Sequence, residues 1–419
     1  MSDWEVQAAR DGERLAALAQ PFLGGHGASG DLYRLLHDAP ERLHRPTRLA
    51  VAGKIKAGKS TLVNAILQRD LAVTDELEAT YRVNEFRRGD KEEIWAHYPS
   101  GPGGNFEPRR FPLSDLGRLT VRDAARTSEL AQPSRIVVRV REEPPRDPVL
   151  RDLVLIDTPG LQSVYGSDSD DTTRLLTRRS GDVLNEADAV LYVFQRDIGD
   201  EDLAVVRKFL GPQSSTWQAN AAKALGVLSQ CDFGWSPPTR DDPLRNDPMA
   251  AKTALIRKWW EAEPELRRTF YEILPVAAKV AERAQLLSAE DLADLRDLGR
   301  WDQDKLTSAL RYRENAFRAR VTDCPLPWER WAALRAQLGV WGLIQAIRYM
   351  NDGCDDATVV TRLVEISGVP RVRELIRSLY GQQRYVIKTT GLLDALRAKC
   401  CASLKTSVAA SSGMSMCSQ

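Results

Sequence analysis

The sequence predicts an α/β fold in which a mostly parallel sheet is flanked by helices, with helical segments at both ends of the chain. Three observations predict it. Short apolar runs alternate with helical patterns from residue 49 to about 295, which is typical of a parallel sheet with helices on both faces. A glycine-rich turn separates the first apolar run from the first of these helices. Beyond residue 296 the strand patterns stop and only helical patterns continue.

We divide the chain into four parts on these patterns. Residues 1–48 carry helical signals broken by a glycine-rich stretch, and they precede the first apolar run. These helices either pack against the C-terminal helices or form a loosely attached arm. The expected parts are a helical segment over 1–48, an α/β domain over 49–296, a helical region over 297–402 and a disordered tail over 403–419.

Composition limits the classes of protein to consider. The chain has 419 residues and is 43% hydrophobic, so it can bury more than one core. Lys+Arg (59) and Asp+Glu (58) nearly cancel, and this balance gives no global field for nucleic acid. The N-terminus lacks the layout of a secretion signal, and apolar runs such as 189–194 are too short for a bilayer. Six cysteines without a C-x-x-C pair indicate a reduced, cytoplasmic protein.

The turn after the apolar run 49–52 has the P-loop pattern G-x-x-x-x-G-K-[ST]. Glycines let the backbone wrap closely around a phosphate chain, and successive amide groups attract negative charge. Lys59 is expected to reach the β- and γ-phosphates, and the Ser60 hydroxyl to hold Mg²⁺. We therefore expect the chain to bind a nucleoside triphosphate. The nucleotide-binding residues expected in the turn are Gly53, Lys54, Ile55, Lys56, Ala57, Gly58, Lys59, Ser60 and Thr61.

A threonine after the P-loop helix is a candidate for a second Mg²⁺ ligand. In GTPases a threonine in this segment completes the metal's shell and senses the γ-phosphate. Thr80, just before the strand expected over 81–86, is the first candidate, and Thr74 is the weaker alternative. A threonine at this place can also start a strand for its β-propensity alone.

The apolar run 153–156 ends in D-T-P-G at 157–160. A carboxylate at the end of such a strand orients a Mg²⁺-bound water. The Gly160 amide can bind the γ-phosphate, so that hydrolysis releases the loop that follows. With the P-loop, this motif predicts a GTPase. The expected metal residues are Ser60, Thr80 and Asp157.

The run 224–228 leads into S-Q-C-D at 229–232, where GTPases read guanine with [NT]-K-x-D. Asp232 is placed to accept hydrogen bonds from N1 and N2 of the base, and Ser229 replaces threonine. Gln230 replaces the lysine whose stem lies over the purine, which leaves the strength of guanine selectivity open. The alternative for Asp232 is a cap of the strand-to-loop turn. A-A-K at 277–279 is a weak candidate for a second base-contacting segment.

Two further stretches carry structural expectations. Residues 99–114 contain a proline- and glycine-rich run and are expected to form a polar excursion before a short helix. The tryptophans of the helical region are expected in core or interface packing rather than in a cofactor site. These tryptophans are Trp301, Trp328, Trp331 and Trp341.

Together these motifs resemble those of the dynamin superfamily, specifically bacterial dynamin-like GTPases. The resemblance is carried by G-K-I-K-A-G-K-S-T-L-V-N-A-I-L, E-L-E-A-T-Y-R-V, D-T-P-G-L and the degenerate L-S-Q-C-D. The stretches G-L-I-Q-A-I-R-Y-M and L-V-E-I-S-G-V-P-R-V-R-E-L-I are similar to helices that follow the GTPase core in that family. The resemblance covers about residues 45 to 400.

The resemblance implies a P-loop GTPase domain with a helical neck or short bundle. It also implies a homodimer through the GTPase domains and hydrolysis coupled to peripheral membrane contact. Leu161 follows D-T-P-G, so no glutamine of the Ras type positions the attacking water. Dynamin-like proteins share this and complete the site on dimerisation, with P-loop residues and a monovalent cation. Ile55 and Lys56 stand where dynamin has polar residues, and we expect the Lys56 ammonium to replace that cation. The catalytic residues so implied are Lys56, Lys59, Thr80 and Gly160.

We expect a Mg²⁺-dependent enzyme that binds GTP and hydrolyses it to GDP and phosphate. The alternative is a nucleotide-gated interaction protein that hydrolyses slowly or not at all. A ribosome-assembly GTPase is the least favoured reading, because no basic appended domain is visible and no nucleic-acid partner is expected. The helical part is short for a full stalk, as expected of a minimal soluble member or of a chain that has been cut short.

Overall fold

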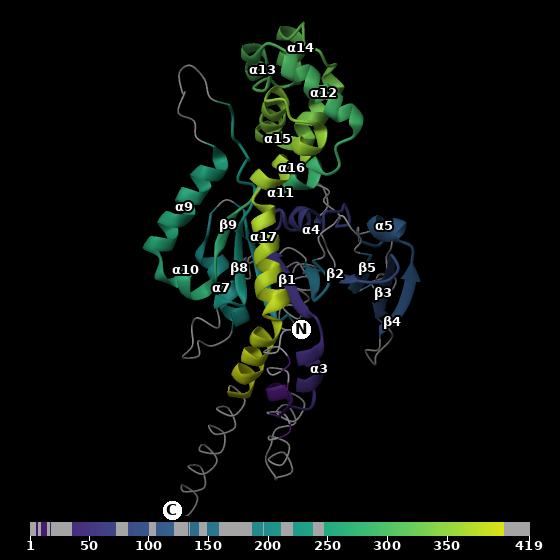
Figure 1. Cartoon of the computed structure of the whole chain (residues 1–419), viewed down its shortest axis with the longest axis vertical. Helices are drawn as coiled ribbons and strands as arrows, with labels where there is room; N and C mark the ends of the chain where they lie inside the picture. The colour runs from purple at the N-terminus through teal and green to yellow at the C-terminus, as the bar shows by residue number, and fades with distance from the viewer. Residues whose placement is uncertain are drawn as a thin grey trace, which may run out of the picture.

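In the part of the chain that it describes, the computed structural model has a single sheet of nine strands at its centre, with helices on both faces and a group of helices at one end (Figure 1). The structure describes residues 6, 10–14, 17, 36–72, 83–99, 106–120, 133, 135–141, 149–158, 187–195, 197–210, 221–237 and 247–397. The strands are β1 (Thr47–Gly53), β2 (Val83–Arg88), β3 (Glu93–Pro99), β4 (Phe106–Phe111), β5 (Arg135–Val140), β6 (Leu153–Asp157), β7 (Ala189–Phe194), β8 (Ala224–Leu228) and β9 (Ile273–Pro275).

The described helices are mostly short and amphipathic, and several begin at sequence signals. Asp247, Ser288, Asp302 and Asp355 each accept a hydrogen bond from a backbone N–H of the first turn. The helices are α3 (Ala39–His44), α4 (Lys59–Leu67), α5 (Leu116–Thr120), α7 (Asp200–Leu210), α9 (Pro248–Ala262), α10 (Pro264–Thr269), α11 (Ala278–Ala284), α12 (Ala289–Arg300), α13 (Gln303–Ala309), α14 (Glu314–Arg320), α15 (Trp328–Asn351), α16 (Asp356–Ile366) and α17 (Val369–Leu375).

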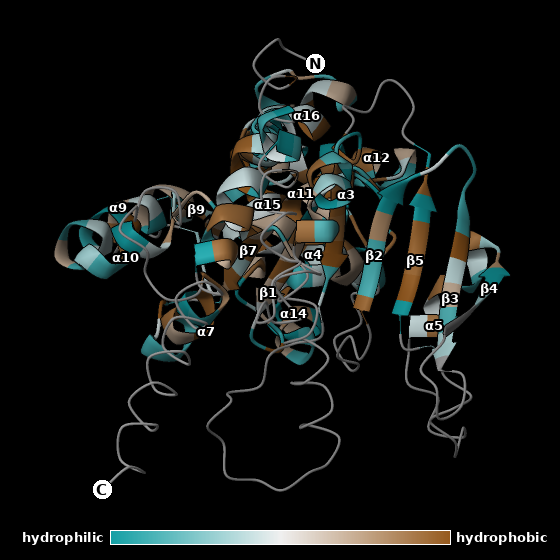
Figure 2. Cartoon of the chain, turned by 90° about the horizontal axis from the view of Figure 1, so that it is seen from below, coloured by the Kyte–Doolittle hydropathy of each residue, from teal (hydrophilic) through white to brown (hydrophobic). Residues whose placement is uncertain are grey.

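The sheet is mostly parallel, as expected. Its strand order is β4-β3-β5-β2-β6-β1-β7-β8-β9. Five of the eight pairings are parallel, and β2–β6, β3–β4 and β3–β5 are antiparallel. Strand β1 lies between β6 and β7, so the P-loop that follows it leaves from the middle of the sheet. Figure 2 shows β2, β5, β3 and β4 side by side, on the opposite side of the molecule from α9 and α10.

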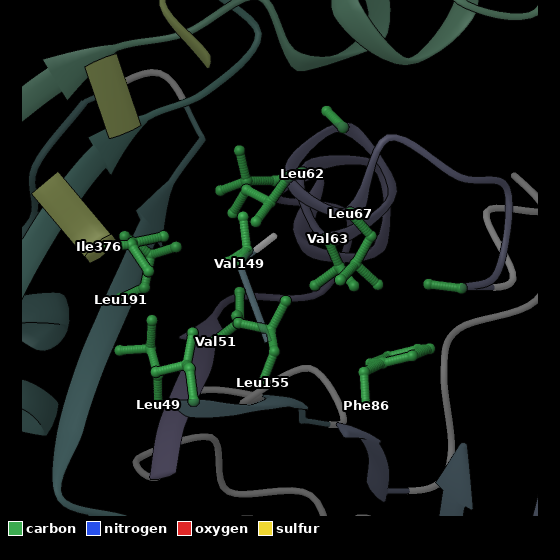
Figure 3. Close-up of a cluster of buried hydrophobic side chains, with 14 of the residues drawn as sticks. Leu49, Val51, Leu62, Val63, Leu67, Phe86, Val149, Leu155, Leu191 and Ile376 are labelled. Carbon is green, nitrogen blue, oxygen red and sulfur yellow. The ribbon is translucent and has the colours of Figure 1, made fainter. Parts of the chain in front are cut away.

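Alternate residues of the central strands face two separate cores, as the pleat requires. Leu49 and Val51 of β1 lie in a cluster with α4 and with residues 369–380, while Ala50 and Ala52 face α7, α9 and α10. Figure 3 shows Leu62, Val63 and Leu67 of α4 gathered above β1 and β6. Figure 3 also places Ile376 beside Leu191, far along the chain from α4. The C-terminal helices therefore complete the core around the P-loop helix.

The helices at one end of the molecule, α12 to α16, pack around a second core together with α11 (Figure 1). Trp331 and Trp341 are fully buried in this core, and Trp301 and Trp328 lie against it. The packing role expected for these tryptophans is confirmed. Helix α15 is interrupted at Gly339, whose φ of 69° and ψ of 176° are not helical.

The segment before β1 is tied to the C-terminal helix. Ala39 and Leu43 of α3 share a small cluster with Leu392 and Leu396. The Lys388 ammonium donates a hydrogen bond of 2.9 Å to the carbonyl of Arg42, and burial lowers the pKa of this lysine to about 8. Residues 36–44 thus pack as the first of the two alternatives expected. The tail expected over 403–419 lies outside the described residues.

The prediction of a polar excursion over 99–114 is wrong in part. Residues 106–111 form β4, which pairs antiparallel with β3, and β3 itself was not expected as a strand. Pro108 in the middle of β4 obscures the strand pattern, but β4 is the edge of the sheet, where a missing N–H is tolerated. The short helix expected after this stretch is present as α5. No helix in the described part of the chain has the length and apolarity that a bilayer span requires.

Candidate nucleotide-binding site

The P-loop leaves the carboxyl end of β1 and returns as α4, the arrangement expected from its sequence. Two of its glycines are needed for steric reasons. Gly53 has φ of 151°, and a Cβ there would lie 2.4 Å from the Val193 carbonyl oxygen. Gly58 has φ of 88°, and a Cβ there would lie 2.9 Å from the Ser229 hydroxyl. Both positions thus require glycine, because the loop is packed closely against β7 and the residues after β8.

Lys59, the first residue of α4, is buried and curls back into the loop. Its ammonium donates hydrogen bonds to the carbonyl oxygens of Gly53 at 3.2 Å and Lys54 at 3.0 Å. Burial lowers the pKa of Lys59, and the nearby Asp157 carboxylate opposes this. A buried cation inside a ring of backbone amides is a suitable partner for phosphate oxygens.

Ser60 and Asp157 meet at the base of the loop, although they are far apart in sequence. The Ser60 hydroxyl donates a 2.8 Å hydrogen bond to Oδ2 of Asp157. Oδ1 of Asp157 is buried and has no hydrogen-bond partner in the described part of the chain. Burial raises the pKa of Asp157 to about 6, against the opposing effects of Lys59 and Ser60. A buried carboxylate of this kind is costly unless a cation completes its surroundings.

The residues present fit Mg²⁺. The Ser60 hydroxyl and the carboxylate of Asp157, whose Oδ1 has no partner in the described part of the chain, are hard oxygen donors of the kind that Mg²⁺ prefers. Water and phosphate would supply the remaining ligands. Among the residues that the structure describes, no group of three or more His, Cys, Asp or Glu could hold a metal by itself. This pattern is consistent with a metal that is held mainly by a bound triphosphate.

The residues after β8 hold the P-loop from the side. The Ser229 hydroxyl donates to the Ala57 carbonyl at 2.6 Å, and Nε2 of Gln230 donates to the Lys56 carbonyl at 2.9 Å. Lys56 and Gln230 both have positive φ, of 61° and 55°. In this structure Gln230 thus supports the phosphate loop, which is a role that the motif alone does not indicate.

Asp232, expected to read the base, lies next to the segment expected to help it. The carboxylate is half-buried, and burial raises its pKa, while Lys279 opposes this. Cys231 N–H donates to the Val276 carbonyl at 3.3 Å, so the two segments are joined through the backbone. The neighbouring positions of β8 and β9 in the sheet bring these segments together.

Two contacts, one of the loop and one of the helix α4 that follows it, were not expected from the sequence. The Lys54 ammonium lies 3.2 Å from Oδ2 of Asp202, a buried residue of α7 that also accepts a hydrogen bond from the Tyr192 hydroxyl at 2.8 Å. On α4, the buried Asn64 donates to Oε1 of Glu282 at 2.8 Å and to the Ala72 carbonyl at 2.9 Å. The acidic start of α7 is a sequence signal for the first contact, but nothing local indicates the second.

The structure therefore gathers most of the expected site residues around one loop. The residues brought together are Gly53, Lys54, Ile55, Lys56, Ala57, Gly58, Lys59, Ser60, Thr61, Asp157, Ser229, Gln230 and Asp232. Thr80, its alternative Thr74, Gly160 and Leu161 lie outside the described residues, so their roles stay predictions.

Comparison with known proteins shows which proteins the chain resembles. Residues 49–204 match the sequence model of the dynamin family. The isoniazid-induced protein IniC of Mycobacterium tuberculosis, from strains CDC 1551 / Oshkosh and ATCC 25618 / H37Rv, is 29% identical over 390 residues. This similarity covers 91% of the present chain and 73% of IniC.

Solved structures of an oligomerised bacterial dynamin pair also match, at 15% identity and TM-scores of 0.39 and 0.42. They cover 73% of this chain, which spans about half (47%) of theirs. The family match holds the P-loop and Asp157, and the similarity to IniC extends through the C-terminal helices. The expected resemblance to bacterial dynamin-like GTPases is confirmed: residues 49–204 are similar to the dynamin family, and most of the chain is similar to IniC.

Proposed function

We propose that this protein binds GTP with Mg²⁺ and hydrolyses the bond between the β- and γ-phosphates by in-line attack of water. The observation that carries the proposal is the joint placement of Lys59, Ser60 and Asp157 at one end of the P-loop. Lys59 is buried with its ammonium on the loop carbonyls, and Ser60 is hydrogen-bonded to the Asp157 carboxylate. Phosphoryl transfer needs a fixed positive charge, backbone N–H groups that bind phosphate oxygens, and oxygen ligands for Mg²⁺. Lys59, the P-loop backbone and the Ser60–Asp157 pair supply these groups.

Each group then has a role in the reaction. The Lys59 ammonium and the loop amides bind the β- and γ-phosphates and stabilise the charge that develops on them. Ser60 would hold Mg²⁺ directly and Asp157 through water, while Thr80 would complete the metal site and the Gly160 amide would sense the γ-phosphate. When bound, Mg²⁺ would neutralise charge on the phosphate oxygens. Asp232, with Ser229 and Gln230, would give the preference for guanine.

The attacking water needs a positively charged neighbour that the motifs do not name. Lys56 is an exposed residue of the loop, and we propose that its ammonium takes the place of a monovalent cation. Turnover in tetramethylammonium buffers, with no sodium or potassium, tests this. Potassium-independent activity supports the role of Lys56, whereas a strict requirement for either ion contradicts it.

The proposed setting is that of the family. The protein would be cytoplasmic, would dimerise through its GTPase domains and would contact membranes peripherally. No nucleic-acid partner is proposed, since the formal net charge is only +1. Phosphate release measured over a range of protein concentrations, with and without anionic liposomes, tests both couplings. A specific activity that rises with concentration supports dimer activation, and a further rise with liposomes supports membrane contact.

The direct test of the enzyme is Lys59→Ala. Loss of GTP binding or a fall of at least about a hundredfold in turnover is expected, because the variant removes the buried phosphate-binding cation. Unchanged GTP hydrolysis in this variant would rule the mechanism out. Arg69→Ala is a suitable control, because this side chain pairs with Glu92 at the surface, past the end of α4.

A second function, a nucleotide-gated interaction protein, is favoured by the substituted Gln230. Gel filtration with GDP, GTP and a transition-state mimic, beside the turnover assay, separates the two functions. Nucleotide-dependent assembly with negligible turnover would establish the second.

A further inference from the structure

The region expected to read the base rests on the helices at the end of the molecule rather than on the sheet alone. Trp235, which follows Asp232 closely in the chain, packs against the second core formed by α11 to α16. The Arg311 guanidinium donates a 3.3 Å hydrogen bond to the Pro237 carbonyl. The loop that carries Asp232 is therefore seated on the helical region.

The second base-side segment has the same support. Ala277 and Val280 lie in the core that also holds Leu338 and Trp341 of α15. Gly342 of α15 is in close contact with α11, because a Cβ at this position would lie 3.0 Å from Cγ2 of Val280. Helix α15 thus packs against the element that carries Lys279.

Between Leu338 and Gly342, which both pack against α11, the helix α15 is broken at Gly339. The φ and ψ angles of 69° and 176° are a combination that is essentially confined to glycine. A Cβ on Gly339 would lie 3.3 Å from Oδ2 of Asp232, which is tighter than ordinary van der Waals contact between carbon and oxygen. At the break, the Gly339 backbone, which carries no side chain, lies near the carboxylate of Asp232, the residue expected to read the base.

We propose that Gly339 is a positioning residue of the guanine site and that α15 forms one wall of this site, holding the Asp232 carboxylate in place for N1 and N2 of the base. This inference rests on the proposed function and deepens it. Since the Asp232 carboxylate lies at the break in α15, a shift of the helix changes guanine affinity. By reciprocity, a bound guanine base favours the seated position of the helix.

The test compares the dissociation constants of GDP and IDP, because inosine lacks the 2-amino group that donates to the carboxylate. Gly339→Ala places a methyl group against Asp232. The expected result is a fall of about tenfold in the preference for GDP over IDP, as expected for a charge-assisted hydrogen bond that is weakened. IDP donates only N1–H to Asp232, whereas GDP donates from both N1 and N2, so IDP affinity should fall less than GDP affinity.

Gly353→Ala is the matched control. Gly353 lies just after the same helix and also has positive φ, of 82°, but a Cβ there would meet nothing within 4 Å. It adds backbone strain without touching Asp232, and its GDP/IDP ratio is expected to equal that of the parent protein. Equal losses in the two variants, or an unchanged ratio in Gly339→Ala, would overturn the inference.

A second variant covers the case in which Gly339→Ala does not fold. Gly342→Ala keeps a helical backbone and adds a methyl 3.0 Å from Val280 Cγ2, which pushes α15 from α11. A smaller loss of the GDP/IDP ratio is expected, and an unchanged ratio contradicts the proposal. If the parent protein itself does not prefer GDP over IDP and ADP, the proposed GTP-binding function fails instead, so the two failures are distinguishable.

Discussion

The side chains of Asn64 and Glu282 are joined by a 2.8 Å hydrogen bond in the core, although 218 positions separate them in the sequence. Asn64 lies on the P-loop helix and Glu282 on α11, the helix shared by the sheet and the helical region. The Asn64 oxygen also accepts from the N–H groups of Leu71 at 2.9 Å and Ala72 at 2.6 Å. One amide therefore links the phosphate loop, the chain that leads towards Thr80 and the helical region.

Asn64→Ala is expected to lower the free energy of unfolding by about 3 kcal/mol, because the backbone N–H groups of Leu71 and Ala72 and Oε1 of Glu282 lose this buried partner. Urea denaturation followed by circular dichroism measures this. Asp70 is an exposed residue, so Asp70→Ala removes only a long, 3.3 Å contact with the same amide, and a change within about 0.5 kcal/mol is expected. A similar loss in both variants would contradict the central role of Asn64.

Binding of Mg²⁺ with GDP is expected to depend on pH through Asp157. Burial raises the pKa of this carboxyl from 3.8 to about 6 in the folded protein. The stability contributed by its protonated form is therefore present below about pH 4 and is lost as the pH rises through about 6. A metal requires the ionised form, so Mg²⁺ affinity should fall by up to about tenfold per pH unit below pH 6 and be flat above pH 7.

Calorimetry in buffers of different ionisation enthalpy checks this. Mg²⁺-dependent GDP binding should release about one proton from Asp157 at pH 5, in addition to the proton of the terminal phosphate of GDP, and none from Asp157 at pH 7.5. The release at pH 5 should be smaller by about one proton in Asp157→Asn. Equal release at pH 5 in this variant and the parent would place the titrating group elsewhere.

Gln230 substitutions are expected to separate loop support from base stacking. Gln230→Lys can keep the donor to the Lys56 carbonyl and adds a charge near the purine face, so GDP affinity should rise by about threefold to tenfold. Gln230→Ala loses the 2.9 Å hydrogen bond and should weaken GDP by a similar factor. Fluorescence titration with labelled GDP and IDP checks both. Higher affinity in the alanine variant would exclude a supporting role for Gln230.

Asp202 is expected to stabilise the protein through its buried contacts. Asp202→Ala leaves the buried Tyr192 hydroxyl and the Lys54 ammonium without this carboxylate, and a loss of about 2–3 kcal/mol is expected. The neighbouring Glu201 is exposed and lies 3.8 Å from the same ammonium. Glu201→Gln should change stability by no more than about 0.5 kcal/mol. Thermal unfolding of the two variants side by side decides between a buried anchor and a general charge effect.

Local sequence patterns predicted the sheet well where apolar runs are flanked by recognisable turns. The apolar runs 49–52, 153–156 and 224–228 lie in β1, β6 and β8. β3 and β4 were missed, since polar residues and Pro108 on an edge strand hide the alternation. The P-loop and Asp157 could be found because phosphate and metal binding fix residue types at short spacing.

The remaining contacts of the site depend on pairs that are distant in sequence. Gln230 differs from the usual motif residue, yet its amide N–H donor supports the loop, and the ammonium of a lysine also carries N–H donors. Asp202 and Gly339 match no motif, and the stretch that carries the resemblance includes Asn64 without indicating its partner. Their significance comes from Lys54, Asp232 and Glu282, which only the tertiary fold places beside them. Apart from the acidic start of α7, the sequence carries no sign of these pairs, because periodicity and spacing describe neighbours along the chain.

The packing of α17 and the residues after it against the P-loop helix also affects how the protein is made. The Arg373 guanidinium donates to the Ile66 carbonyl at 2.9 Å, and Ile376 and Tyr380 are fully buried beside α4. A ribosome synthesises this region long after the P-loop. During that time the apolar residues of α4 and β1 that this region covers in the folded protein are exposed. We expect chaperone binding during this interval, and we expect a fragment ending near residue 296 to aggregate.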